Sequence, residues 1–301
     1  MLNGQMIGRL DLNRPGSWSN MITPATRPPI PSDVRQVLRQ EAGFGCCVCG
    51  FPIYDYHHII PYAVRQHFDP KDMMVLCPNH HREASSGCIT QPEQRKYKFH
   101  PFNIVRGYVD GKLKVVQSEL VVEAGSTQFI RDGFIFLVDT EPLLSLSINS
   151  NNVLEISVKL YDQQNLLLAS VDRNEWRSQT NLLWDLRYGF QWVTIHQKKH
   201  KVALSIDARH TPLKVLGSLW FRQQRFAMSN QTLSFNGVVR NVSFSNLCLV
   251  GMYLKADTQS KQFSLVPDER YGKGSMVSEA DKEGRIQKGL AVWDEIRSKT
   301  S

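Results

Sequence analysis

The sequence has few cysteines, no long apolar run and no signal-peptide core, and each absence narrows the class of protein. Six cysteines in 301 residues are too few for a scaffold held by disulfides. No stretch approaches the roughly 18 consecutive apolar residues of a membrane-spanning helix. Arg9, Asp11 and Arg14 interrupt the first residues before an apolar leader can form. We therefore expect a soluble, cytoplasmic protein without a membrane partner.

Two kinds of catalytic motif are also missing. We find no glycine-rich phosphate loop and no Ser-His-Asp arrangement. What is present is the composition of a globular protein, with 42% hydrophobic and 10% aromatic residues. The net charge of +8 is spread out, with +3 on residues 1–100 and +5 on the rest. It is compatible with an anionic partner but does not locate a binding face.

Proline and apolar spacing indicate how the N-terminal third is organised. Residues 1–31 contain five prolines and are expected to form an extended arm. Ser32 is expected to cap a short helix that ends before Gly43. Further along, the pattern predicts a short buried strand from Met73 to Leu76. It also predicts a helix over residues 80–86 and another over residues 91–98. We assign residues 32–100 to one domain.

The pattern changes near residue 103, where short apolar runs begin to alternate with turn signals. Pairs such as Asp110-Gly111 and Asp132-Gly133 are typical of hairpins. Residues 103–255 therefore predict an all-β domain, with a sandwich favoured over a β-helix because no fixed repeat is present. Residues 256–277 are expected to form a polar loop. An amphipathic C-terminal helix should follow from Ser278 to the end of the chain at residue 301.

Metal-binding residue types are concentrated between residues 46 and 81. A Cys-x-x-Cys pair comes first, then the run His-His-Ile-Ile-Pro, then Cys-Pro-Asn-His-His. Thiolate and imidazole are the ligands that zinc prefers, and two such pairs can close a tetrahedral site. The four expected ligands of a structural zinc are Cys46, Cys49, Cys77 and His80. Three histidines of the motif are then left over, namely His57, His58 and His81.

These three segments resemble the HNH (ββα-metal) nucleases, in the subgroup whose hairpin is tied by zinc. The resemblance covers roughly residues 32–98, with His80 where the family more often has cysteine. It implies that His57 and His81 hold a catalytic divalent cation, Mg²⁺ or another. His58 would be the general base, a role that suits a histidine that is neutral near pH 7. Asp72 falls at the position of the family's central asparagine and is expected to orient His58 or to join the cation.

The predicted fold is thus α+β: an N-terminal HNH nuclease domain with a structural zinc, an all-β domain and a C-terminal helix. The predicted function is metal-dependent hydrolysis of nucleic acid, with DNA as the expected substrate. The β domain would serve regulation, targeting or assembly, and by analogy the protein would act in restriction or antiphage defence. A homo-oligomer through the β domain or the last helix stays open. The alternative is a zinc-ribbon protein that binds nucleic acid, or assembles with partners, without catalysis.

Overall fold

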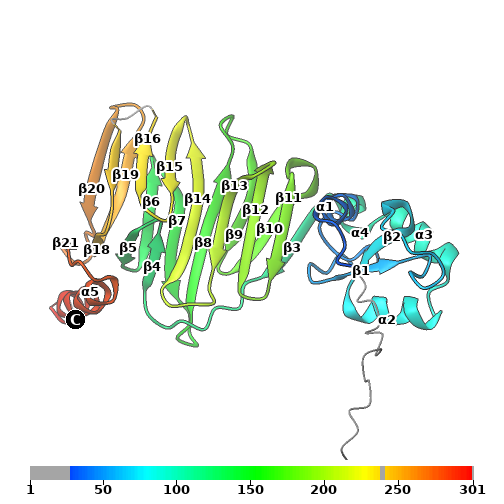
Figure 1. Cartoon of the computed structure of the whole chain (residues 1–301). Coiled ribbons are helices and arrows are strands. Elements are labelled where there is room, and N and C mark those ends of the chain that lie inside the picture. Colours follow the sequence, from blue (N-terminus) through cyan, green and yellow to red (C-terminus); the bar gives the residue numbers. More distant parts are fainter. Residues whose placement is uncertain (1–27, 238–240, 300–301) are drawn as a thin grey trace, which may run out of the picture.

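Helices and a two-stranded hairpin occupy one end of the structure, and strands fill most of the rest (Figure 1). The computed structural model describes residues 28–237 and 241–299, so most of the expected N-terminal arm lies outside the described residues. Ser32, expected as a cap, is instead the first residue of its helix. The N-terminal elements are α1 (Ser32–Glu41), β1 (Asp55–His58), the 3-10 helix η1 (Pro70–Asp72), β2 (Met73–Leu76), α2 (Pro78–Ser86), α3 (Gln91–Phe99) and α4 (Phe102–Arg106).

Strands β1 and β2 pair antiparallel and lead directly into α2. β2 is buried along its whole length because all four of its residues are apolar, and His58 of β1 lies opposite Met73. Cys77 precedes the first turn of α2, and Pro78 occupies a helical position where a missing N–H is tolerated. Gly87 ends the helix with a φ of 84°. The predicted strand and all three predicted helices of this region, now α1, α2 and α3, are confirmed.

The β region contains the remaining strands. They are β3 (Tyr108–Lys112), β4 (Val121–Ala124), β5 (Thr127–Ile130), β6 (Gly133–Val138), β7 (Glu141–Ile148), β8 (Leu154–Tyr161), β9 (Leu167–Asp172), β10 (Glu175–Gln179), β11 (Asp185–Gly189), β12 (Trp192–Lys198), β13 (Lys201–Asp207), β14 (Leu213–Phe221), β15 (Gln224–Met228), β16 (Leu233–Asn236), β17 (Val242–Phe244), β18 (Cys248–Val250), β19 (Met252–Asp257), β20 (Gln262–Pro267) and β21 (Ser275–Val277). A 3-10 turn, η2 (Thr180–Leu182), precedes β11.

These strands build two facing sheets, which the pairing of Trp220 in β14 with Tyr161 in β8 joins into one closed barrel. One runs β3-β10-β9-β8-β7-β6-β19-β20. The other runs β11-β12-β13-β14-β15-β16-β17, and a branch β4-β5-β18-β21 pairs with the first residues of β14. Phe136 of β6 stacks on Phe226 of β15 across the core, with ring centroids 4.4 Å apart. The predicted predominance of strands is confirmed, but the strands form one closed barrel rather than the separate sheets of the expected sandwich.

The C-terminal segment differs in part from the expectation. The polar loop predicted over residues 256–277 is wrong, because β20 and β21 lie there and extend the two sheets. Helix α5 (Lys282–Ser298) begins after Asp281, whose carboxylate accepts a hydrogen bond from the Gly284 N–H at 2.7 Å. Its buried Trp293 packs in an apolar cluster with Ile130 and Val250. The predicted C-terminal helix is therefore confirmed, and it packs on the β region.

The helical end meets the β region through α1 and β11. The guanidinium of Arg39 forms two hydrogen bonds to the carboxylate of Asp185, at 2.8 and 2.7 Å, and both residues are buried. Beside it, the amide of Gln40 donates to the Trp184 carbonyl at 2.6 Å. Within the described ranges, no helix is both long and apolar enough to cross a membrane.

Candidate metal centre and histidine cavity

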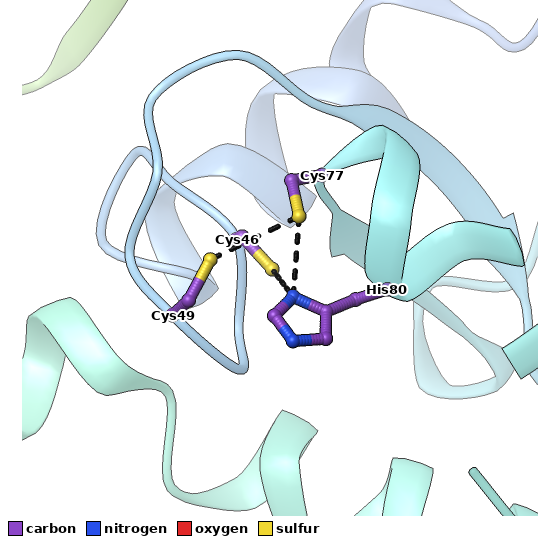
Figure 2. A group of neighbouring side chains, drawn as sticks. All are labelled: Cys46, Cys49, Cys77 and His80. Atoms are coloured by element: carbon purple, nitrogen blue, oxygen red, sulfur yellow. Dashed lines mark hydrogen bonds between the residues drawn. The ribbon is translucent and has the colours of Figure 1, made fainter. Parts of the chain in front are cut away.

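Four side chains from two separate motifs converge at the start of α2. Cys46 and Cys49 come from the loop after α1, Cys77 precedes α2, and His80 lies in its first turn (Figure 2). Their ligand atoms all lie within 4.8 Å of one another. The structure thus brings together the four residues that the sequence predicts as zinc ligands, and this group can hold a metal ion.

The distances fit a tetrahedral metal better than a disulfide. The sulfurs of Cys49 and Cys77 are 3.8 Å apart, and the Cys46 sulfur is 3.5 Å from Nδ1 of His80. Two sulfurs bound tetrahedrally to zinc at about 2.3 Å would lie about 3.8 Å apart. A disulfide needs about 2.05 Å between its sulfurs. All four ligands are protein side chains, which is the closed arrangement of a structural zinc site rather than a catalytic one.

A buried asparagine holds the loop that carries Cys46 and Cys49. Asn103 of α4 is fully buried, and its Nδ2 donates to the carbonyls of Gly43 at 3.1 Å and Gly50 at 2.9 Å. Gly50 has a φ of 77°, and a Cβ there would lie 2.3 Å from Oδ1 of Asn103. Only glycine suits this turn. The sequence reasoning missed Asn103 because nothing near it in the chain relates it to the cysteines.

Burial keeps the thiols of Cys46 and Cys49 protonated before a metal binds. It raises the pKa of the Cys46 thiol to about 12, against the lowering effect of backbone hydrogen bonds. Burial also raises the pKa of Cys49. Both are therefore thiols at neutral pH without a cation, and metal binding must displace their protons. Affinity for the metal consequently increases with pH.

The cysteines outside the cluster have separate environments. Cys47 is buried beside β2, and its N–H donates to the Val75 carbonyl at 2.9 Å. Cys88 is exposed and accepts a hydrogen bond from the Ser86 hydroxyl at 3.3 Å. Cys248 is buried in β18. None of the three belongs to the described cluster.

Further histidines border a cavity of about 520 Å³. β1 supplies His57 and His58, α2 supplies His81, and α3 supplies Gln94. The rings of His57 and His81 are perpendicular, with centroids 4.9 Å apart. We call this space the histidine cavity. The structure therefore gathers all three histidines of the motif that the Cys46, Cys49, Cys77 and His80 cluster leaves unused.

His57 is held by a glutamine that the sequence reasoning missed. The amide nitrogen of Gln94 donates to the Ile89 carbonyl at 2.8 Å, which turns its oxygen toward His57. Nε2–H of His57 then donates to that oxygen at 3.1 Å, so the lone pair of the neutral ring is on Nδ1. Burial, and next the neighbouring His81, lower the pKa of His57 to about 4. His57 is therefore neutral at pH 7, the form that binds a cation.

His58 points to different neighbours from His57, as adjacent residues on a strand do. Nε2–H of His58 donates to the backbone carbonyl of His67 at 3.0 Å, which makes Nδ1 its basic nitrogen. The rings of Tyr62, His67 and Phe68 pack edge-on around it. His67 is itself held by the Ile60 carbonyl, at 3.1 Å. His67 lies within the motif region, but nothing in the sequence indicates that its backbone carbonyl accepts the hydrogen bond from His58.

The carboxylate of Asp72 is not among the groups that line the histidine cavity. It pairs with Arg95 at 2.5 Å and with Arg65, and the hydrogen bond from Arg95 is the largest effect that lowers its pKa. Its contact near His58 is through the backbone, where the Ile59 N–H donates to the Asp72 carbonyl at 2.8 Å. Asp72 therefore helps to place the end of β1, and the expected cation ligation by its side chain is not supported.

Comparison with protein-family models, curated proteins and solved structures finds no match for this chain. The functional argument therefore depends on the geometry of the metal cluster and the histidine cavity.

Proposed function

We propose that this chain is a metal-dependent nuclease that hydrolyses phosphodiester bonds in the histidine cavity. The substrate we expect is DNA, and the zinc cluster has a structural role. The β region would position or regulate the nuclease, in keeping with the resemblance to nucleases of restriction and antiphage defence. The overall charge of +8 is compatible with a polyanionic substrate.

The observation that carries the proposal is the perpendicular pair of His57 and His81. Two imidazoles bound to one cation through nitrogens at about 2.1 Å would have ring centroids about 4.5 to 5.2 Å apart. The observed separation is 4.9 Å. The pair is extra to the zinc cluster, whose four ligands are already supplied by protein side chains. A purely structural zinc ribbon gives no reason for these two histidines to meet.

The roles of the histidines follow from their contacts. A divalent cation held by His57 and His81 would stabilise charge on the phosphate and on the leaving oxygen. His58, in the tautomer set by the His67 carbonyl, accepts a proton from the attacking water at Nδ1. The water oxygen forms the new bond to phosphorus as the bond to the leaving oxygen breaks. Gln94 keeps His57 in the orientation that ligation requires.

The donor set favours a transition metal over Mg²⁺. Imidazole nitrogen is a common ligand of zinc, nickel and iron, whereas Mg²⁺ prefers carboxylates and water. Among the described residues that line the histidine cavity there is no Asp or Glu. We therefore expect Ni²⁺ or Zn²⁺ to support cleavage at lower concentrations than Mg²⁺ does.

The test is cleavage of supercoiled DNA by the zinc-loaded full chain with a panel of divalent metals. His58→Ala should lose about 10²- to 10⁴-fold in single-turnover rate, the usual contribution of a general base, while it still binds DNA. His81→Ala should weaken activation by the cation, and excess metal should partly restore the rate. His210→Ala is the matched control, because His210 is exposed in the loop between β13 and β14.

Two outcomes would contradict the proposal. If no metal supports cleavage although DNA binds, the alternative of a non-catalytic zinc-ribbon protein is correct. If His58→Ala cleaves at the wild-type rate in saturating metal, His58 is not the base.

A further inference from the structure

A second cavity, of about 300 Å³, lies where α1 meets β11 and β12. We call it the junction cavity. Its walls come from α1, from the segment 52–56 that leads into β1, and from the β11–β12 hairpin. Ligand binding in this cavity would be independent of the proposed cleavage reaction.

The junction cavity is electropositive. Arg35, Arg39 and Arg187 line it, and none of its described lining residues is Asp or Glu. One carboxylate lies behind the wall: Asp185, which is fully buried and accepts from Arg39 and, at 3.2 Å, from Nε of Arg187. One negative charge against three guanidiniums leaves an excess of about two positive charges. The Arg187 side chain is 56% exposed, so its remaining N–H groups can face a ligand.

The same cavity has an aromatic wall. Its aromatic lining residues are Tyr54, Tyr56, Tyr188 and Trp192. Trp192 lies against the backbone of Gly189, where a Cβ would come within 2.4 Å of its Nε1. Glycine at this position and the guanidinium of Arg209, which lies 5.8 Å from the ring centroid, hold the indole on the hairpin, so the wall is formed before any ligand arrives. Aromatic faces stack on nucleobases of any sequence, and guanidiniums bind phosphate oxygens.

We propose that the junction cavity binds one nucleotide, with its phosphate between Arg35 and Arg187 and its base against Trp192. The volume is at the lower end of the range for ligand pockets, about 300 to 1,000 Å³, so a single nucleotide fills it and a longer strand does not. The nucleotide can be a free small molecule or the end of a nucleic-acid strand, since both present the same base and phosphate.

The test is calorimetric titration of the zinc-loaded full chain, without added catalytic cation. The probes are AMP, inorganic phosphate, and a short oligothymidylate with or without a 5′-phosphate. AMP should bind one to one and more tightly than phosphate. Trp192→Ala should weaken AMP binding about tenfold or more, as loss of base stacking does. Arg187→Ala should weaken it about tenfold, as loss of hydrogen bonds to a charged group does. Trp192→Phe should keep most of the affinity.

The matched controls are Trp220→Ala and Arg225→Ala. Arg225 lies over the Trp220 ring, 5.5 Å from its centroid, on β15 and β14, and neither residue lines the junction cavity. Both controls should bind AMP like the wild type. Equal affinity for AMP and the phosphorylated oligonucleotide would point to a free nucleotide, and tighter oligonucleotide binding to a strand end. The proposal is overturned if AMP does not bind, or if Trp192→Ala and Arg187→Ala bind it like the controls.

Discussion

The two ends of the Gln94 amide have different purposes. Its amide nitrogen is anchored on the Ile89 carbonyl, and its oxygen receives Nε2–H of His57. Partners of this kind fix the tautomer and the ring orientation of a metal-binding histidine. In the proposed nuclease, Gln94 would therefore position His57 rather than contact substrate.

Replacing Gln94 by Ala should lower the affinity of the histidine cavity for its cation about 10- to 100-fold, because His57 loses its orientation. The rate of cleavage at saturating metal should change less than the metal concentration for half-maximal activity. Metal titrations with calorimetry and with cleavage rates check both quantities. Gln91→Ala is the control, because Gln91 also lines the cavity but is exposed at the start of α3. Equal metal affinity in the two variants would show that Gln94 does not position His57.

The pKa of His57 predicts how stability changes with pH. Because burial lowers this pKa from 6.5 to about 4, the folded state binds a proton less readily than the unfolded state. The contribution of His57 to stability is thus fully present above pH 6.5 and is lost as the pH falls toward 4. Between pH 7.5 and 5 the loss should approach about 2 kcal/mol, as an upper bound.

The measurement is urea unfolding of the wild type and of His57→Gln at several pH values, with zinc present and no second cation. The difference between the two proteins isolates His57, because the other titrating groups are common to both. The wild type should lose more free energy of unfolding than the variant on acidification. Parallel curves would show that His57 does not titrate as its burial implies.

At the scale of elements, the loop after α1 and helix α2 both supply residues of the Cys/His cluster, so both should depend on a bound metal. Cys49 is the exposed ligand of the four, so Cys49→Ser removes a metal ligand without creating a core cavity. We expect the wild type to hold one tightly bound zinc and the variant to hold less than one. The variant should also lose the thermal unfolding transition of the N-terminal region. The reason is that the free energy of metal binding stabilises the folded state of such small units.

Cys88→Ser is the matched control for this substitution, because Cys88 is also exposed and lies outside the cluster. It should keep full zinc content and the wild-type transition. Elemental analysis and differential scanning calorimetry give both quantities. A metal-free wild-type protein with unchanged thermal stability would refute the structural role of zinc.

The elements that the sequence predicted well are those with a strong local signal. β2 is an unbroken apolar run, α3 begins with a Thr90–Glu93 capping box, and the four zinc ligands lie in two close pairs. β20 was missed because it lies at a sheet edge, where none of its residues is fully buried, and because polar and charged residues precede and follow it. α4 was missed because it has only five residues and is held in place by Asn103 rather than by helical periodicity.

At the scale of the whole molecule, long-range pairs have no sequence signal at all. Arg39 and Asp185 are 146 residues apart, yet they form the buried ion pair between the helical end and the β region. The walls of the junction cavity are also long-range, because they come from α1, the segment 52–56 and the β11–β12 hairpin. The sequence could suggest a metal cluster and spare histidines, but it could not place Gln94, His67 or the junction cavity beside them.

Asp185→Ala should destabilise the protein by about 3 to 5 kcal/mol, because it leaves the buried Arg39 without its counter-charge. Asp207→Ala is the control: Asp207 pairs with Arg209 near the surface, with side chains 26% and 53% exposed. That loss should be about 1 kcal/mol or less. Chemical unfolding followed by tryptophan fluorescence measures both. Similar losses in the two variants would mean that the buried pair contributes no more than a surface pair.

His80 and His81 are successive residues in the first turns of α2, and the N–H of His81 donates to the carbonyl of Cys77 at 2.8 Å. One short helix therefore serves both the cysteine cluster and the histidine cavity. The practical result concerns the order of addition in reconstitution. A chelator strong enough to strip the cluster also releases the helix that presents His81, so zinc must be restored before any activating cation is titrated. A chelator can inactivate the protein in a way that the activating cation alone does not reverse. That result would show loss of the metal that holds α2 in place, and it would not identify the activating metal.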